Sequence, residues 1–296
     1  METSTMRRIS TAVVAGVALT AVAACGSSGG TAKKTGGDTG GGAVKEVSPI
    51  AALQLAQQKT GETKSAKVEG TTVMGSTMSM KQSGVMAWSN GVTGTMDITY
   101  TAGTMANTMK QMGTDGTVKA RYLHDGYYVN MGDVFAKQSG GKHWIQYRYA
   151  DMARLMGASG DAMKDQMQNT TPDQGVKSLL ASGDVKKVGT EDVRGVSATH
   201  YSGTVDVAKL TERNTALSAE KMAALKAQLE KAGITTEQVD IWINKDNLLV
   251  KKIERGQMKT GELNSTVYYS DYGVAAPAEA PPAGDTIDFT KMINKQ

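Results

Sequence analysis

The chain has 296 residues, and its 33 lysines and arginines against 29 aspartates and glutamates give a formal net charge of +4. Basic and acidic residues are interleaved without a polybasic block, which argues against a nucleic-acid partner. Cysteine occurs once, at Cys25, and a single cysteine excludes an internal disulfide.

The first 24 residues have the three parts of an export signal. Arg7 and Arg8 supply positive charge, an uncharged run over residues 11–24 follows, and small residues precede Cys25. The apolar run is shorter than the about 20 residues that a helix needs to span a bilayer. The sequence therefore predicts a signal peptide over residues 1–24.

The segment Val22-Ala23-Ala24-Cys25-Gly26 resembles the lipobox of bacterial lipoprotein precursors. The resemblance implies a diacylglyceryl group on the Cys25 sulfur and cleavage before this residue. Two acyl chains suffice for stable attachment to a membrane. The alternative is an ordinary secretory signal that happens to contain a cysteine, which leaves an odd thiol in an exported protein unexplained. We expect an exported protein held at the outer face of the cell membrane.

Composition divides the rest of the chain into three parts. Residues 25–43 are rich in Gly, Ser, Thr and Lys, which is typical of a flexible tether. Residues 44–274 are long enough for one sizeable core, or for two small ones, and are predicted to fold as one domain. Residues 275–296 form a Pro- and Ala-rich tail that is expected to be extended and poorly ordered, with residues 287–293 docking back.

The predicted domain opens with a helix. Ser48 can cap a helix with its hydroxyl. The helix is expected to begin at Pro49, because the fixed φ of proline suits the first helical position. Ile50, Leu53 and Ala56 lie on one face of this helix.

After the helix the apolar residues recur with a period of two, which indicates strands. Asn90-Gly91 is a strong hairpin signal, and weaker strands are expected over residues 104–112, 118–124 and 127–131. The pattern predicts an antiparallel meander with one apolar face and one wet face. The apolar face of the first strands carries Met74, Met78, Met80, Met86, Trp88, Met96, Ile98 and Tyr100.

The middle of the chain is predicted to be helical, and its end returns to strands. Helices are expected around residues 149–167, over 172–182 and, most clearly, over 218–232. Strands are expected over residues 185–188 and 196–205 and then over 237–244, 248–254 and 263–272. The apolar positions of the helices are Tyr149, Met152, Leu155, Met156, Met163, Met167, Val176, Leu179, Leu180, Met222, Leu225 and Leu229. Strands and helices segregate along the chain, so the predicted class is α+β.

Catalytic and metal-binding motifs are missing from the sequence. HExxH, GxSxG and P-loop patterns do not occur, and a single cysteine cannot give cysteine-based metal spacing. His124, His143 and His200 are far apart in sequence, so a structural role is expected for each. We predict no catalytic residue, no metal and no cofactor.

Two short matches to the motifs of penicillin-binding enzymes are interpreted as chance. Residues 218–221 fit SxxK and residues 259–261 fit KTG, but the SDN element that stands between them in those enzymes is missing. Ser218 is better explained as the cap of an amphipathic helix.

Methionine is abundant, with 18 residues, and many of these lie on the apolar face of the predicted meander. Methionine is flexible and polarizable, and it suits surfaces that adapt to a ligand. The alternative is an ordinary core between a sheet and its helices.

The layout as a whole resembles the LppX/LprG-like lipoproteins, which are related in shape to the lipoprotein carrier LolA. The resemblance covers residues 44–277 and rests on the lipobox, the early helix, the long meander and a late strand pair. That pair has the sequences IWINKD at residues 241–246 and LLVKKI at residues 248–253, and a closing strand follows at 265–272. The resemblance implies a strongly curved antiparallel sheet, a half-barrel, with helices covering its concave face.

In several members of that family, the space between sheet and helices holds the acyl chains of a lipid or lipoglycan. The resemblance implies a protein that binds, carries or presents such a lipid without catalysis, and we expect it to be a monomer. The alternative is a cell-envelope scaffold of the same fold with a closed core; an enzyme ranks third. The candidate lining residues are Met74, Met78, Met80, Met86, Trp88, Met96, Ile98, Tyr100, Met152, Leu155 and Met156.

Overall fold

The computed structural model describes residues 48–157, 160, 164, 167–168, 171–182, 184–206, 227 and 230–293. Cys25, the predicted tether, Met163 and most of the helix predicted over residues 218–232 lie outside this part of the chain. Within the described residues, no helix is long and apolar enough to cross a membrane.

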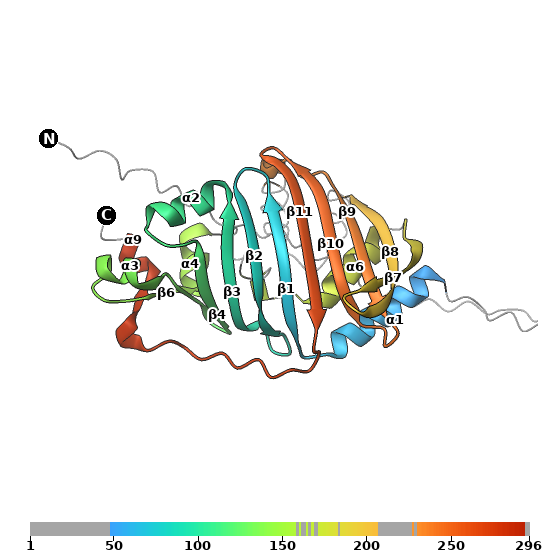
Figure 1. Ribbon diagram of the computed structural model, residues 1–296, viewed down its shortest axis with the longest axis horizontal. Coiled ribbons are helices and arrows are strands. Elements are labelled where there is room, and N and C mark those ends of the chain that lie inside the picture. The colour runs from blue at the N-terminus through green and yellow to red at the C-terminus, as the bar shows by residue number, and fades with distance from the viewer. Residues whose placement is uncertain are drawn as a thin grey trace, which may run out of the picture.

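One sheet of 12 strands organises the fold (Figure 1). Its order is β12-β6-β5-β4-β3-β2-β1-β11-β10-β9-β8-β7, so β1 and β11 meet in the middle and β12 and β7 are the edges. All neighbours are antiparallel except β12 and β6, which are parallel. The strands are β1 (Ser65–Met74), β2 (Met78–Ala87), β3 (Thr93–Ala102), β4 (Thr117–Leu123), β5 (Gly126–Asn130), β6 (Trp144–Arg148), β7 (Lys186–Val193), β8 (Val196–Asp206), β9 (Thr236–Asn244), β10 (Leu249–Met258), β11 (Gly261–Ser270) and β12 (Thr286–Asp288).

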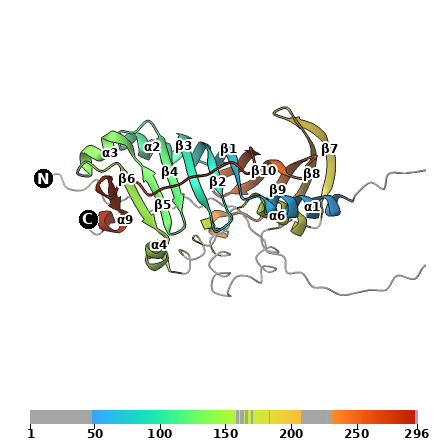
Figure 2. The same ribbon diagram turned by 90° about the horizontal axis from the view of Figure 1, so that it is seen from below.

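Helices α1 (Pro49–Glu62), α4 (Tyr149–Met156) and α6 (Pro172–Ser182) lie on one side of the sheet (Figure 2). α1 packs on α6, α6 packs on β8, β9 and β10, and α4 packs on β5 and β6. We call the side that bears α1 and α6 the concave face and the opposite side the convex face. The sheet is open and its helices are segregated, which confirms the predicted α+β half-barrel.

The predicted alternation in the first strands is confirmed. Met74 pairs with Met78, and Met86 pairs with Gly94 across β2 and β3, so the even-numbered side chains share the concave face. Gly84 lies on the same face, and a Cβ placed there would come within 2.6 Å of the Met96 Sδ. Glycine is therefore required where β2 approaches β3 so closely.

Two predictions about local structure are wrong. Residues 104–112 were expected as a strand but form helix α2 (Gly103–Gln111), which starts at a positive φ of 85° at Gly103. Met105 and Met109 satisfy both a period of two and a helical spacing of four, so the sequence pattern is ambiguous here. Ile50, expected on the buried face of α1, is 39% exposed, while Leu53 and Ala56 are fully buried as predicted.

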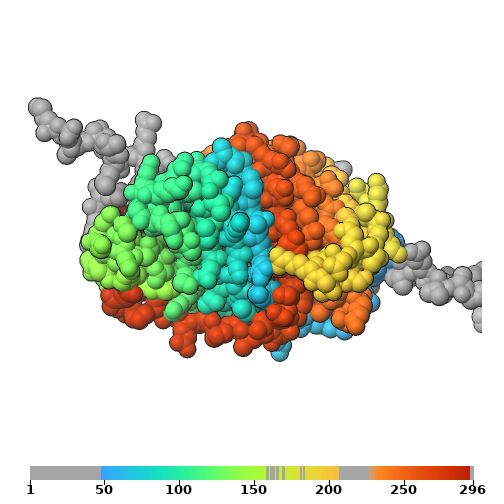
Figure 3. Space-filling view, viewed as in Figure 1, coloured from blue at the N-terminus to red at the C-terminus, as the bar shows by residue number. Residues whose placement is uncertain are grey.

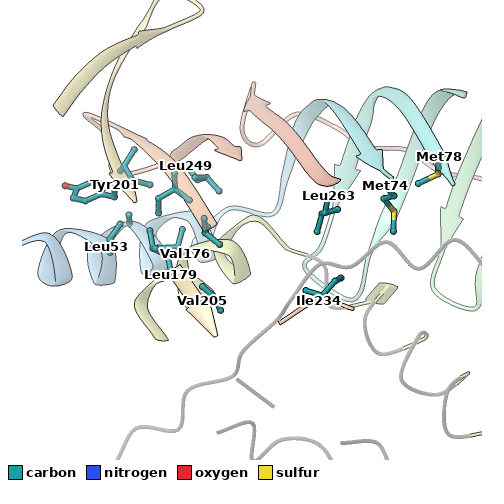
Figure 4. Packing of buried hydrophobic residues seen from close by; sticks show 14 residues of the cluster. Leu53, Met74, Met78, Val176, Leu179, Tyr201, Val205, Ile234, Leu249 and Leu263 are labelled. Atoms are coloured by element: carbon teal, nitrogen blue, oxygen red, sulfur yellow. The ribbon is translucent and has the colours of Figure 1, made fainter. Parts of the chain in front are cut away.

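The main core lies between the concave face and helices α1 and α6 (Figure 4). Leu53 of α1 and Val176 and Leu179 of α6 pack against Ile241 and Leu249 of β9 and β10, and all five are fully buried. A second cluster occupies the concave face of β3–β6 and includes Met96, Ile98, Met109, Val118, Ala120, Met131 and Ile145. A small third cluster, around Trp242, Val250 and Ile253, lies on the convex face.

The C-terminal segment is part of the fold, which corrects the prediction of a poorly ordered tail. After β11 the chain runs to a short helix, η1 (Ala283–Asp285), and then adds β12 in parallel to β6. Helix α9 (Phe289–Ile293) follows, and Phe289 and Met292 pack against the second cluster. The predicted docking of residues 287–293 is confirmed.

Helix α3 (Gly132–Gln138) joins β5 to β6. The helix predicted to end at Gly233 does end there: Gly233 has a positive φ of 78°, and its N–H donates to the Glu230 carbonyl. A turn at Asp246-Asn247 joins β9 to β10, and Asn247 has a left-handed φ of 60°.

Candidate functional site

A surface of methionines and tyrosines covers the concave face of β2–β6. Alternation brings the side chains of five neighbouring strands to the same face, because each strand is in register with the next. We call this the methionine–tyrosine surface and define it by Met80, Met86, Met96, Tyr100, Tyr122, Tyr127 and Tyr147.

The tyrosine rings of this surface stack on one another. Tyr127 and Tyr147 are nearly parallel with ring centroids 4.8 Å apart, and Tyr122 lies 5.9 Å from Tyr127. Tyr149, at the start of α4, is 6.3 Å from Tyr127, and Phe289 of the C-terminal helix is 4.8 Å from Tyr147. Such offset ring pairs give a rigid apolar wall that still carries hydroxyl groups.

Burial keeps these phenols uncharged. It raises the pKa of Tyr147 and that of Tyr149 to about 12, and it raises the pKa of Tyr122 and of Tyr127 well above the ordinary value. The Tyr149 hydroxyl is buried and has no hydrogen-bond partner within the described chain. The Tyr127 hydroxyl reaches only the Met152 sulfur, at 4.0 Å.

Several side chains of this surface are incompletely covered although they face the concave side. Met80, Met86, Tyr100, Tyr122 and Tyr147 are half-buried, in contrast to the fully buried aliphatic residues under α1 and α6. Met80 and Tyr100 pack against both concave clusters. They therefore lie where the two clusters meet.

Most of the residues predicted as a lining lie together. Met74 and Met78 belong to the main core, while Met86, Met96 and Ile98 belong to the second cluster and Met80 and Tyr100 touch both. Met152 is buried beside Tyr127, and Met156 is half-buried in α4.

Trp88 and Leu155 lie elsewhere than predicted. Trp88 follows the end of β2, where its indole donates to the Thr63 carbonyl at 2.8 Å and meets the Tyr272 ring edge-on. The strand ends one residue before Trp88, so the alternation no longer decides its direction. Leu155 is 50% exposed on α4, because the buried side of that helix is formed by Tyr149 and Met152.

Sequence reasoning missed the tyrosines of β4–β6. The turn at Asp125-Gly126 joins the two strands predicted over residues 118–124 and 127–131, and it pairs Tyr122 with Tyr127. Extending the alternation across that turn would have placed both rings on the apolar face, and Tyr147 with them.

Polar side chains form a band on the concave face that runs from β9 across β10, β11 and β1 to β2. We call it the polar band and define it by Thr72, Gln82, Glu237, Lys252, Glu254 and Ser265. The Lys252 Nζ donates to the Glu254 carboxylate at 2.5 Å, and both residues are buried. α6 lies directly over the lysine, since a Cβ on Gly175 would be 2.6 Å from the Lys252 Cδ.

Glu237 is the least exposed member of the polar band, at 1%. Neither of its carboxylate oxygens has a hydrogen-bond partner in the described structure. Burial, together with the nearby Glu254, raises the pKa of Glu237 to about 9, so this carboxyl is protonated at neutral pH. Burial lowers the pKa of Lys252 and the Glu254 carboxylate raises it, with a net upward shift that keeps the lysine charged.

A separate network of ion pairs, hydrogen bonds and ring contacts lies on the convex face. The β7–β8 hairpin, yellow in Figure 3, lies across the orange strands and reaches the blue strand β1. At its tip, Arg194 bonds Glu69 of β1 at 2.6 Å and stands 3.7 Å over the Tyr268 ring. His200 stacks on Trp242 and bonds Glu191 at 3.0 Å and Asp240 at 2.9 Å.

His143 is also held by carboxylates, since its Nδ1 lies 2.6 Å from Asp285 in the C-terminal segment. Both His143 and His200 are thus bonded to carboxylates of neighbouring segments. Among the described residues, no group of three His, Cys, Asp or Glu side chains could hold a metal ion. Ser218 of the SxxK match lies outside the described residues.

Two proteins from streptomycetes are similar to this chain over most of its length, while no family model matches it. An uncharacterized 31.2 kDa protein encoded in the rplA-rplJ intergenic region of Streptomyces griseus is 64% identical over 85% of this chain and 83% of its own length. SCO4650 of Streptomyces coelicolor, which is provisionally named a lipoprotein, is 42% identical over 100% of this chain and 99% of its own length.

Among solved structures, the chain is similar to LprF from Mycobacterium bovis, with a TM-score of 0.48 and 12% identity over 79% of this chain and 97% of LprF. It is also similar to the lipoprotein LppX from Mycobacterium tuberculosis, with a TM-score of 0.46 and 14% identity over 78% of this chain and 98% of LppX. On the strength of its two streptomycete relatives, the chain belongs to the lipoprotein family of SCO4650.

Proposed function

We propose that this protein is anchored to the outer face of the cell membrane by a lipid on Cys25 and binds the acyl chains of a lipid or lipoglycan on its methionine–tyrosine surface. Binding and release proceed by hydrophobic transfer, without catalysis. The chain belongs to a lipoprotein family, whereas its ligand and the binding site are proposed from the geometry of the structure.

The single observation that carries the binding site is the incomplete burial of the methionine–tyrosine surface. Met80, Met86 and Tyr100 face the concave side, and Met80 and Tyr100 border both clusters, yet all three remain half-buried. Their apolar area is therefore available to a ligand, and burying it contributes roughly 25 cal/mol per Å². Methionine side chains adapt to chains of differing length and unsaturation.

The anchor is supported by the position of Cys25 in the chain. It follows the predicted export signal, it is the only cysteine, and 22 residues lie between it and the first described residue, Ser48. A segment of this Gly- and Ser-rich composition holds a domain near a surface without fixing its orientation.

Lipid binding is tested on the chain from Gly26 onward, expressed in a lipid-containing bacterial host. Native mass spectrometry and organic extraction measure how much acylated lipid co-purifies with the protein. Met86→Trp fills part of the methionine–tyrosine surface and is expected to lower lipid occupancy at least several-fold. The matched control is Val73→Trp, which adds the same ring on the convex face at a residue that is 39% exposed.

A wild-type protein that stays lipid-free even after incubation with envelope lipids would contradict the binding site. That result favours the envelope scaffold with the same fold.

The anchor is tested separately by labelling with radioactive palmitate in the native host. Labelling is expected for the full chain and should vanish in Cys25→Ala; equal labelling of both would contradict the anchor.

A further inference from the structure

One fully buried side chain of the polar band makes no hydrogen bond in the described structure. Lys252 and Glu254 satisfy each other, and the hydroxyls of Thr72 and Ser265 lie 3.3 Å apart. Glu237 has no such partner, although it is 1% exposed. A buried polar group without a partner costs about 1–3 kcal/mol of stability. If this position served only to fill the core, an apolar residue would stabilise the fold better than Glu237.

Two further unpartnered atoms lie on helices that border the same face. In the described part of the chain, the buried side-chain oxygens and nitrogens without a hydrogen bond belong to Tyr149, Gln174 and Glu237. Tyr149 begins α4, and Gln174 precedes the glycine of α6 that covers Lys252. All three residues belong to elements that enclose the concave side.

The charges of the polar band cancel. Lys252 and Glu254 form a neutral pair, and burial raises the pKa of Glu237 to about 9, which leaves its carboxyl uncharged at neutral pH. A neutral carboxyl offers one O–H donor and one C=O acceptor. An uncharged hydroxyl complements both, whereas an anionic group would meet no uncompensated positive charge.

We propose that Glu237, beside the Lys252–Glu254 pair, binds the uncharged, hydroxyl-bearing polar group of an amphiphile whose acyl chains lie on the methionine–tyrosine surface. This inference rests on the proposed function and names the class of its ligand. Glu237 lies on β9 beside Val205 and Val239 of the main core, and the polar band runs from it across β10, β11 and β1 to Gln82 on β2. Gln82 is next to Met80 on the same face, so one amphiphile that lies along this band can place a polar group at Glu237 and acyl chains on β2–β6.

The test uses two probes that differ in one hydroxyl, on the chain from Gly26 onward. 1,2-Dioleoylglycerol carries a free hydroxyl, and its 3-O-methyl ether has the same acyl chains without that donor. Competition between them is measured by native mass spectrometry. The wild type is expected to prefer the free hydroxyl about tenfold, as one unmade buried hydrogen bond predicts.

Glu237→Leu is expected to abolish this preference while the methyl ether binds as well as it does to the wild type. Glu237→Gln keeps a donor and an acceptor and is expected to retain most of the preference. Asp240→Asn is the matched control, because Asp240 is a buried acid on the convex side of β9 whose oxygens are already bonded by His200 and Arg255. It should keep the wild-type preference even where its melting temperature falls.

The possible results separate this inference from the function on which it rests. Preference retained in Glu237→Leu, or a wild type that binds both probes equally, overturns the inference and leaves the lipid carrier standing. Dioleoyl phosphatidate serves as a third, anionic probe, and a wild type that prefers it to 1,2-dioleoylglycerol overturns the uncharged class. A wild type that binds no probe overturns both proposals.

Discussion

The two halves of the concave face are built from different side chains. Under α1 and α6 the core is aliphatic, and Leu53, Val176, Leu179, Ile241 and Leu249 are all fully buried. On β2–β6 the surface consists of methionines and stacked tyrosines, of which several are half-buried. The first half is close-packed like any protein core, whereas the second keeps adaptable and incompletely covered side chains.

This difference separates stability from binding within one sheet. A close-packed core loses stability with every methylene removed, because the cavity that remains cannot collapse fully. Half-buried methionines lose less, since water or neighbouring side chains already reach them. Substitutions in the aliphatic half should therefore lower the free energy of unfolding more than substitutions in the methionine–tyrosine half.

The largest effect is expected in the aliphatic half. Leu179→Ala should lower the free energy of unfolding by about 2–5 kcal/mol, because Leu179 is fully buried between α6 and the sheet. Urea denaturation measures this loss. Met86→Ala, in the other half, should cost less than about 2 kcal/mol, and equal losses at the two positions would remove the contrast between the halves.

The next effect concerns the docking of the C-terminal helix on the methionine–tyrosine half. Phe289→Ala removes the ring that packs 4.8 Å from Tyr147 and should cost about 1–3 kcal/mol, less than for a fully buried ring. Hydrogen exchange should become faster in β6 and unchanged in β9. Ile293→Ala, at a 39% exposed position of the same helix, is the control; β6 amides that stay protected in Phe289→Ala would contradict the prediction.

A smaller effect is expected on the convex face. Arg194→Ala removes an ion pair with Glu69 and a cation–π contact with Tyr268, and the loss should be about 1 kcal/mol because the guanidinium is partly exposed. Thermal unfolding measures it. Arg154→Ala, which breaks an ion pair within α4 at a side chain that is 73% exposed, should have no measurable effect.

The smallest effect is a dependence on pH. The hydrogen bond to Asp285 raises the pKa of His143 above its ordinary 6.5, so the pair stabilises the fold fully below that value and less as pH rises through the raised pKa. His143→Gln should lower the melting temperature more at pH 5.5 than at pH 8.5. A difference of the opposite sign would show that the neutral histidine makes the better contact.

Much of this fold can be read from the sequence. Alternation placed Met74, Met78, Met86 and Met96 on one face correctly, because a period of two with a strong hairpin signal leaves little choice of register. The charged part of the polar band could not be predicted. Lys252 and Glu254 alternate with apolar residues, and charged residues in a strand are ordinarily expected on the wet face.

Long-range pairing is the other part that the sequence could not supply. The parallel pairing of β12 with β6 joins residues 286–288 to residues 144–146, and a three-residue strand has no local signal of its own. The docking of the tail was nevertheless predictable, since Ile287, Phe289 and Met292 are apolar residues in an otherwise polar segment.

The pairing of β1 with β11 affects folding when the N-terminal part of the chain becomes available before the C-terminal part. β1 can pair with β2 at once, but its other edge stays unpaired until β11 is available, and Thr72 and Ser265, which meet there, are 193 positions apart. Closing so long a loop is slow, and an unpaired strand edge can pair with other chains in the meantime. A chain cut off before residue 261 should therefore self-associate through β1, and the complete chain needs protection from aggregation until its last strands arrive.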